Sequence, residues 1–182
     1  RVLFRSQELA FDHAIVATGS RPIMLPAFDI GSDRIMDSTG ALELADIPQR
    51  MLVVGGGIIG LELGQVYAAL GTQVSVVEMT DGLIPPGDRD LVRILQKRLQ
   101  SQFEQIRLET KVVGVAEEGD RLKVTMVPAS GGDEIVEHYD RVLLSIGRRP
   151  NSEDLGLENT KVQIDERGFL QADVQRRTAE PT

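Results

Sequence analysis

The chain has 182 residues, 41% hydrophobic and 26% charged, which is enough for one good-sized core with the composition of an ordinary soluble globular protein. Its formal net charge of −8 argues against nucleic acid or an anionic membrane as the main partner, and no apolar run approaches membrane-spanning length. Cysteine is absent, which excludes disulfides, zinc–thiolate sites and thiol catalysis within the chain and makes a cytoplasmic location the default expectation.

The first part of the chain predicts an extended segment and a short helix. Residues 9–17 read as a strand that runs into Thr18-Gly19-Ser20. A strand ending in this way could bring a hydroxyl and backbone groups to a nucleotide, but the pattern alone favours a plain exit from strand to loop. Ser38 or Thr39 is expected to cap a helix that reaches Ala45.

A βαβ unit with a dinucleotide-binding fingerprint is predicted over residues 51–78. An apolar run at 51–54 ends in the turn Gly55-Gly56-Gly57-Ile58-Ile59-Gly60. Apolar residues at helical spacing follow, and a β-branched run at 74–77 then ends on Glu78. Strand, glycine turn, helix, strand and acid therefore occur in the order that a bound dinucleotide requires.

Each position of the fingerprint, the three glycines and the acid, has a physical role in binding a dinucleotide. Gly55 allows the sharp turn after the strand, Gly57 lets a diphosphate approach the backbone, and Gly60 lets the helix lie close to the strands. The helix N-terminus offers unpaired N–H groups and a partial positive charge to the diphosphate. Glu78 can accept hydrogen bonds from both hydroxyls of an adenosine ribose and would repel a 2′-phosphate. The acid therefore favours NAD over NADP.

The remainder of the chain predicts a helix, further strands and a meander. Asp88 is expected to cap an amphipathic helix that ends near residue 102, and a third parallel strand follows at 106–109. Three alternating segments predict an antiparallel meander laid against the sheet, at 112–116, 122–127 and 135–139. A final buried strand is expected at 141–146, and the polar segment from residue 152 onward should have little core.

The order of several motifs resembles that of the flavoprotein disulfide reductases, the pyridine nucleotide-disulfide oxidoreductase family. The motifs are ATGSRP at 17–22, GGGIIGLELG at 55–64, VVE at 76–78 and, after the meander, SIGRRPN at 145–151. Within that family the chain is most similar to the dihydrolipoamide dehydrogenases, as in LETKV at 108–112 and DERGF at 165–169. The resemblance covers nearly the whole sequence.

The resemblance implies an α/β, Rossmann-like FAD/NAD(P)-binding domain, with a parallel sheet, helices and an antiparallel β-meander. It implies that residues 1–30 belong to the side of the FAD domain and the crossover, that 31–150 form the NAD-binding domain, and that 151–182 are a truncated return segment toward the FAD domain. The first residue is not methionine and the C-terminus has no clear structural terminator, so we expect the chain to be a piece of a longer protein.

The resemblance also implies site residues. NAD would be bound by Gly55, Gly57, Ile58, Ile59, Gly60, Glu62, Glu78, Val112 and Gly147, and FAD in the complete enzyme would be touched by Thr18, Gly19 and Ser20. Ile58 matches the gate over the flavin face. Glu62 matches a family acid near the nicotinamide and flavin, although the pattern alone favours an acid that complements the helix dipole. Neither a metal site nor a catalytic residue is expected in this chain.

Members of this kind oxidise dihydrolipoamide through FAD and a redox disulfide and reduce NAD. The partners implied are NAD(H), the FAD and dimerisation domains of the parent chain, and the lipoyl domains of 2-oxo-acid dehydrogenase complexes; nucleic acid and membrane are not expected. Because the family's cysteine pair and main flavin motifs are missing, we expect the chain to bind NAD(H) but to be inactive alone. Two alternatives stay open: the same domain of another NAD(P)-linked flavoenzyme, such as an NADH oxidase, a coenzyme-A disulfide reductase or a transhydrogenase, and a regulatory NAD-sensing module.

Overall fold

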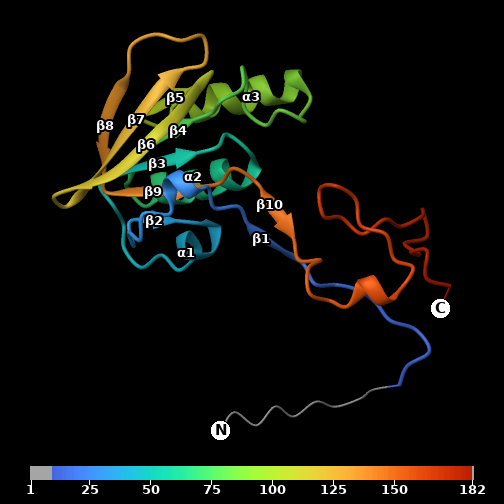
Figure 1. Ribbon diagram of the computed structural model, residues 1–182. Helices are drawn as coiled ribbons and strands as arrows, with labels where there is room; N and C mark the ends of the chain where they lie inside the picture. The colour runs from blue at the N-terminus through green and yellow to red at the C-terminus, as the bar shows by residue number, and fades with distance from the viewer. Residues whose placement is uncertain (1–9, 182) are drawn as a thin grey trace, which may run out of the picture. The chain divides into compact units, whose positions relative to one another are not determined.

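The computed structural model describes residues 10–181 (Figure 1). The chain divides into two compact units, one of residues 22–148 and one of the described residues before 22 and after 148. In chain order the elements are β1 (Ser20–Pro22), η1 (Pro26–Phe28), β2 (Ile35–Met36), α1 (Ser38–Leu42), β3 (Arg50–Val54), α2 (Ile58–Ala69), β4 (Gln73–Val77), α3 (Arg89–Leu99), β5 (Gln105–Arg107), β6 (Thr110–Glu118), β7 (Arg121–Pro128), β8 (Ile135–Tyr139), β9 (Arg141–Leu144), β10 (Arg148–Pro150) and η2 (Leu157–Asn159).

The larger unit is built on a five-stranded parallel sheet in the order β2-β9-β3-β4-β5. Successive side chains of a strand point to opposite faces. Along β3, Met51 and Val53 therefore enter one apolar core and Leu52 and Val54 enter another. The predicted β3–α2–β4 unit and the parallel sheet are both confirmed.

Helices cover one face of this sheet. Leu61 and Tyr67 of α2 are buried against it, and α3 adds Val92 and Leu99 to the same core. The Tyr67 hydroxyl donates to the backbone oxygen of Ala41 at 2.9 Å, which ties α2 to α1. The helices and the sheet thus share one continuous apolar layer.

The antiparallel meander β6-β7-β8 covers the opposite face, as predicted (Figure 1). Its middle strand turns Leu122, Val124 and Met126 inward, and all three are fully buried. They pack in the same core as Leu52 and Val54 of β3. The parallel sheet is therefore sandwiched between a helical layer and a second sheet.

A charged cluster lies between the parallel sheet and the meander beside this apolar core. Tyr139 donates from its hydroxyl to Glu137 Oε2 at 2.6 Å, and Arg107 donates to Glu137 Oε1. Arg50 lies 3.6 Å from Glu137 Oε2 and places its guanidinium carbon 5.0 Å from the centre of the Tyr139 ring. It also donates to Glu104 at 3.1 Å. Burial alone would raise the pKa of Glu137, but these hydrogen bonds and the two arginine charges outweigh it and lower that pKa.

The smaller unit has little core, in agreement with the polar sequence after residue 152. Ser152 is the only buried residue among those described from 149 to 181. β1 pairs with β10. Thr18 and Asn151 bond each other: the threonine hydroxyl donates to the Asn151 backbone oxygen at 2.6 Å, and the asparagine amide donates to the Thr18 backbone oxygen at 3.0 Å.

Three local predictions need correction. Residues 10–17 form no strand, and Ile15 is 94% exposed, because no described strand lies beside them to pair with their backbone groups; Leu9 lies outside the described residues. Helix α1 is capped by Asp37 rather than by the hydroxyls that follow it, and it ends at Leu42. Asp88 does occupy the N-cap position of α3, but its side chain makes no capping hydrogen bond.

The charged cluster predicts an acid-dependent stability. Glu137→Gln should lower the free energy of unfolding at pH 7 by about 1.5–3 kcal/mol, because charge-assisted hydrogen bonds to Tyr139 and Arg107 are lost. The folded pKa of Glu137 is lowered, so its ionised form stabilises the protein above the unfolded pKa, and this contribution is lost as pH falls through the folded pKa.

Urea unfolding at a series of pH values between 7 and 3.5 checks this, with the exposed Glu134→Gln as a control of equal charge change. The difference between wild type and Glu137→Gln should shrink below about pH 4.5. A difference independent of pH would show that the ionised carboxylate is not what stabilises the fold.

Candidate functional site

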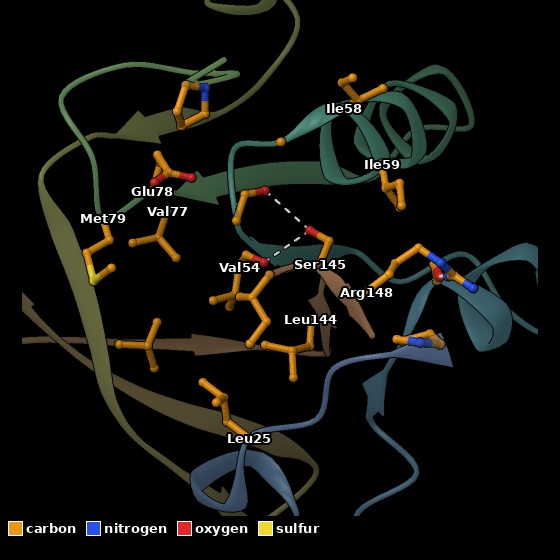
Figure 2. A pocket seen from close by; sticks show the side chains of 18 of the residues that line it. Leu25, Val54, Ile58, Ile59, Val77, Glu78, Met79, Leu144, Ser145 and Arg148 are labelled. Carbon is orange, nitrogen blue, oxygen red and sulfur yellow. Dashed lines mark hydrogen bonds between the residues drawn. The ribbon is translucent and has the colours of Figure 1, made fainter. Parts of the chain in front are cut away.

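The carboxyl ends of the parallel strands open into a pocket of about 780 Å³ (Figure 2). It lies where the strand order reverses, since the chain leaves β3 for β4 on one side while β9 pairs with β3 on the other. Open α/β sheets bind ligands in the crevice at such a point. The strand ends contribute Val54, Gly55, Val77, Glu78, Leu144 and Ser145 to the lining.

The glycine turn between β3 and α2 has one open position, Gly57, and three crowded ones, Gly55, Gly56 and Gly60. Gly55 has φ +108°, and a Cβ there would lie 2.5 Å from the backbone oxygen of Ser145. A Cβ on Gly60 would lie 2.5 Å from the Gly55 oxygen and 2.9 Å from Val53 Cγ1. A Cβ on Gly57 would meet no heavy atom within 4 Å, and Gly57 lines the pocket. The empty space next to the backbone is thus on the side of the turn that faces the pocket.

No side chain of residues 10–181 caps the N-terminus of α2. Gly57 is its N-cap, and its first turn holds no acidic residue. In α1 the Asp37 carboxylate accepts from the backbone nitrogens of Thr39 and Gly40 at 2.8 and 2.9 Å, and α3 has Asp90 in its first turn. Among the α-helices of residues 10–181, α2 alone therefore has neither a side-chain cap nor an acid in its first turn. An anion in the pocket could fill that role.

Glu78 stands at the end of β4 on the pocket wall (Figure 2). Its Oε2 accepts from the Gly56 backbone nitrogen at 2.7 Å. Its Oε1 accepts from the Thr80 backbone nitrogen at 2.8 Å and from the Thr80 hydroxyl at 2.9 Å. A carboxylate offers about four lone-pair positions, so the side chain is fixed in orientation by the chain and can still accept from a ligand.

Ser145 supports the turn from the far side of β3. Its hydroxyl lies 3.0 Å from the Val54 oxygen and 3.2 Å from the Gly55 oxygen, and it donates toward both (Figure 2). Its backbone nitrogen also donates to the Val54 oxygen at 2.9 Å. The sequence reasoning missed Ser145, although the rule that the carboxyl ends of parallel strands meet at one edge could have found it.

The remaining walls are mostly apolar. Charged lining residues besides Glu78 are Lys111 and Arg148, and Arg148 donates to the Ser38 hydroxyl at 3.4 Å. The other lining side chains come from the segments on either side of the strand ends: Pro22, Leu25, Phe28, Ile58, Ile59, Met79, Ile84, Pro85, Pro86, Thr110, Val112 and Ile146. An apolar pocket of this volume with few polar groups is suited to a ligand that carries flat rings.

The structure gathers most of the residues assigned to NAD in this pocket: Gly55, Gly57, Ile58, Ile59, Glu78, Val112 and Gly147 line it. Gly60 lies beneath the turn, in contact with the strands. Glu62 is exposed on α2 and is not part of the lining. Thr18, Gly19 and Ser20 belong to the other unit.

Within residues 10–181, the His, Asp and Glu side chains form no group of three that could hold a metal ion. No helix of these residues combines the length and the apolar character needed to span a bilayer.

Comparison with known proteins gives a consistent result. The model of the family described as pyridine nucleotide-disulphide oxidoreductase matches residues 3–182. The chain is 48% identical over 171 residues to a dihydrolipoyl dehydrogenase of Vibrio parahaemolyticus, which covers 94% of this chain and 36% of that protein. It is 43% identical to the dihydrolipoyl dehydrogenase of Thermus scotoductus, over 92% of this chain and 36% of that protein.

Solved structures agree with the sequence relatives. The flavoprotein disulfide reductase RclA of Escherichia coli, in a Cu(II) complex, superposes with a TM-score of 0.78 at 26% identity, over 91% of this chain and 36% of that one. LpdA of Mycobacterium tuberculosis gives a TM-score of 0.78 at 28% identity, over 90% of this chain and 34% of that one.

The chain thus spans just over a third of the length of the relatives that it matches. The predicted Rossmann-like α/β fold is confirmed by these relatives and by the architecture above. With the family model matched from residue 3 to residue 182, the chain belongs to the pyridine nucleotide-disulphide oxidoreductase family.

Proposed function

We propose that the chain is an NAD(H)-binding domain and that the pocket at the strand ends holds the dinucleotide. The observation that carries the proposal is the meeting of two features in one pocket. The uncapped N-terminus of α2 opens onto it at Gly57, and the acid at the end of the next strand, Glu78, lines the same wall. A dinucleotide offers a diphosphate to the first feature and a ribose diol to the second.

The residues present fit the diphosphate. The open space beside Gly57 lets phosphate oxygens reach the backbone N–H groups of the first turn of α2, which have no intrahelical partners. The crowding at Gly55 and Gly60 fixes the backbone that carries these groups. When bound, NAD would supply a nicotinamide ring able to accept or donate hydride.

The adenosine ribose is assigned to Glu78 and its neighbours. Glu78 would accept from the ribose hydroxyls, and Val112 and Gly147 would line the adenosine side. Ile58, Ile59 and Glu62 would serve the nicotinamide side. Since Glu78 is an anion, the pocket should prefer NAD to NADP.

For the whole protein we propose the activity of a dihydrolipoyl dehydrogenase, supported by the dihydrolipoyl dehydrogenases that share 43–48% identity with this chain. Residues 1–30 and 151–182 would then belong to the side of the FAD domain, with Thr18, Gly19 and Ser20 near FAD, and residues 31–150 to the NAD domain. The FAD and dimerisation domains, and lipoyl domains of 2-oxo-acid dehydrogenase complexes, would be its partners in the cytoplasm. Another NAD(P)-linked flavoprotein reductase is the second candidate, since RclA and LpdA share the fold at 26–28% identity.

The chain by itself should be colourless and unable to reduce lipoamide with NADH. It has no cysteine and so cannot form the redox disulfide that this reaction needs. Absorbance between 350 and 500 nm and a coupled NADH oxidation assay test the two statements. A purified chain that is yellow with stoichiometric FAD would contradict the first, and turnover would contradict the second.

Gly57→Val should weaken NADH binding by at least about tenfold, or 1.4 kcal/mol. The branched side chain would fill the open space that the diphosphate is proposed to enter, while the backbone there, at φ −80°, accepts any residue. Calorimetric titration with NADH measures the loss. Gly114→Val in β6, outside the pocket lining, serves as the control. Unchanged affinity in a folded Gly57→Val protein would remove the diphosphate assignment.

Glu78→Ala should narrow the gap in binding affinity between NADH and NADPH, because it weakens the binding of NADH and strengthens that of NADPH. NADH should bind about 10- to 100-fold more weakly, since charge-assisted bonds to the ribose are lost, and NADPH should gain because its 2′-phosphate no longer meets a carboxylate. Adding Met79→Arg should help NADPH further, because guanidinium pairs with phosphate.

Competitive titration of both nucleotides measures this gap, with Thr80→Val as the matched control. That variant removes one hydrogen bond to Glu78 but keeps its charge, so the preference for NADH should survive. Equal binding of the two nucleotides by the wild type would mean that Glu78 does not read the ribose.

A further inference from the structure

One wall of the pocket is a loop with an unfavourable backbone conformation that other contacts must hold in place. The 79–87 loop joins Glu78 to α3 and places Met79, Ile84, Pro85 and Pro86 on the pocket. Ile84 has φ +43°, in the left-handed region that β-branched residues avoid. Such a conformation is unfavourable and persists only where surrounding contacts fix it.

Several hydrogen bonds fix Ile84. Its backbone nitrogen donates to the Gly56 oxygen at 2.9 Å, and its own oxygen accepts from the Gly87 nitrogen at 2.8 Å. The same Ile84 oxygen also accepts from the guanidinium of Arg89, the first residue of α3. The strained residue is thus held by the glycine turn on one side and by α3 on the other.

Arg89 holds the loop at three points. Its Nη2 donates to the Leu83 oxygen at 3.0 Å, to the Ile84 oxygen, and to the Gly87 oxygen at 2.8 Å. Its Nε donates to the Gly87 oxygen at 3.0 Å. A planar guanidinium can join several carbonyls in this way, whereas an ammonium group acts as a single compact charge.

The position of Arg89 in its helix is electrostatically unfavourable. A cation at a helix N-terminus opposes the macrodipole, which favours acids there and bases at the other end. α3 follows that rule elsewhere, with Asp90 in its first turn and Lys97 and Arg98 in its last. The hydrogen bonds to the loop account for an arginine at this position despite the unfavourable helix dipole.

The loop is in turn joined to the proposed nucleotide site through Gly56. The nitrogen of Gly56 donates to Glu78 Oε2, and its oxygen accepts from Ile84. A Cβ on Gly56 would lie 2.7 Å from Leu83 Cδ2 and 3.0 Å from Glu78 Cβ. The glycine turn, Glu78 and the 79–87 loop therefore form one connected unit, with Arg89 at its outer end.

We propose that Arg89 is a positioning residue for the adenosine half of NAD. It would hold the 79–87 loop as the wall beside Glu78, without touching the nucleotide itself. The inference rests on the proposed function, because that assigns the Glu78 end of the pocket to adenosine. If losing Arg89 leaves the loop in its binding arrangement about a tenth of the time, the apparent Kd for NADH rises by about tenfold.

The experiment compares Arg89→Gln with Arg93→Gln in the same chain. Both residues are exposed and both variants remove one positive charge from α3, but Arg93 lies one turn further along the helix and, among residues 10–181, makes no hydrogen bond to the 79–87 loop. Calorimetry gives the affinity for NADH, and competition gives that for reduced nicotinamide mononucleotide, which lacks adenosine. Hydrogen exchange of the Ile84 and Gly87 amides reports on the ligand-free loop. Arg89→Lys is the milder variant, should the glutamine variant unfold.

We expect Arg89→Gln to weaken NADH about tenfold, to leave the mononucleotide within twofold, and to speed amide exchange in the loop. Arg93→Gln should match the wild type, and Arg89→Lys should fall between. Equal losses for NADH and the mononucleotide, equal behaviour of the two glutamine variants, or loop exchange unchanged in Arg89→Gln would each overturn the role of Arg89. A wild type that binds no NADH would instead remove the proposed function and this inference with it.

Discussion

Helix α2 lies so close to strand β3 that no side chain fits at Gly60, and the rest of the site depends on that approach. A Cβ there would lie 2.5 Å from the Gly55 oxygen and 2.9 Å from Val53 Cγ1. Because α2 cannot move away without opening the core around Leu61 and Tyr67, its N-terminus is fixed at the edge of the sheet. The N–H groups of its first turn, which have no intrahelical partners, then lie at the pocket, with open space beside Gly57. The helical layer thus supplies the charge of the site as well as part of the core.

The meander contributes the opposite wall by a different kind of interaction. Thr110, Lys111 and Val112 of β6 line the pocket, and β6 is held by its pairing with β7. β7 packs through apolar contacts, while the charged cluster around Glu137 joins β8 to the ends of β3 and β5. Apolar contacts are non-directional, whereas hydrogen bonds to a carboxylate are directional. The cluster can therefore fix the meander in one orientation over the sheet.

Glu78 has a structural role in addition to its proposed role in binding the ribose, and the sequence motif does not distinguish the two. Its carboxylate orients the glycine turn through Gly56 and the following loop through Thr80, and it also faces the pocket. An acid held in this way is oriented before a ligand arrives, and preorganisation of that kind favours binding. The same hydrogen-bonded connections extend through Ile84 to Arg89, so the orientation of the Glu78 carboxylate is linked to a residue at the far end of the loop.

The sequence by itself determined the β3–α2–β4 unit, the meander and the fingerprint residues Gly55, Gly57 and Glu78 of the pocket. These follow from local rules: the side-chain period changes from helical to alternating, and glycine is required where a Cβ would collide. Only the tertiary structure decided the contacts between distant residues. Ser145 bonds the Val54 oxygen across 91 positions of the chain, and the strained Ile84 donates to the oxygen of Gly56, from which it is separated in the sequence by α2 and β4. The expected strand before Thr18 failed for the same reason, since a strand exists only where a neighbour pairs with it. Residue types and their spacing reflect local conformational preferences. Hydrogen bonds between residues far apart in the chain form only when the layers pack.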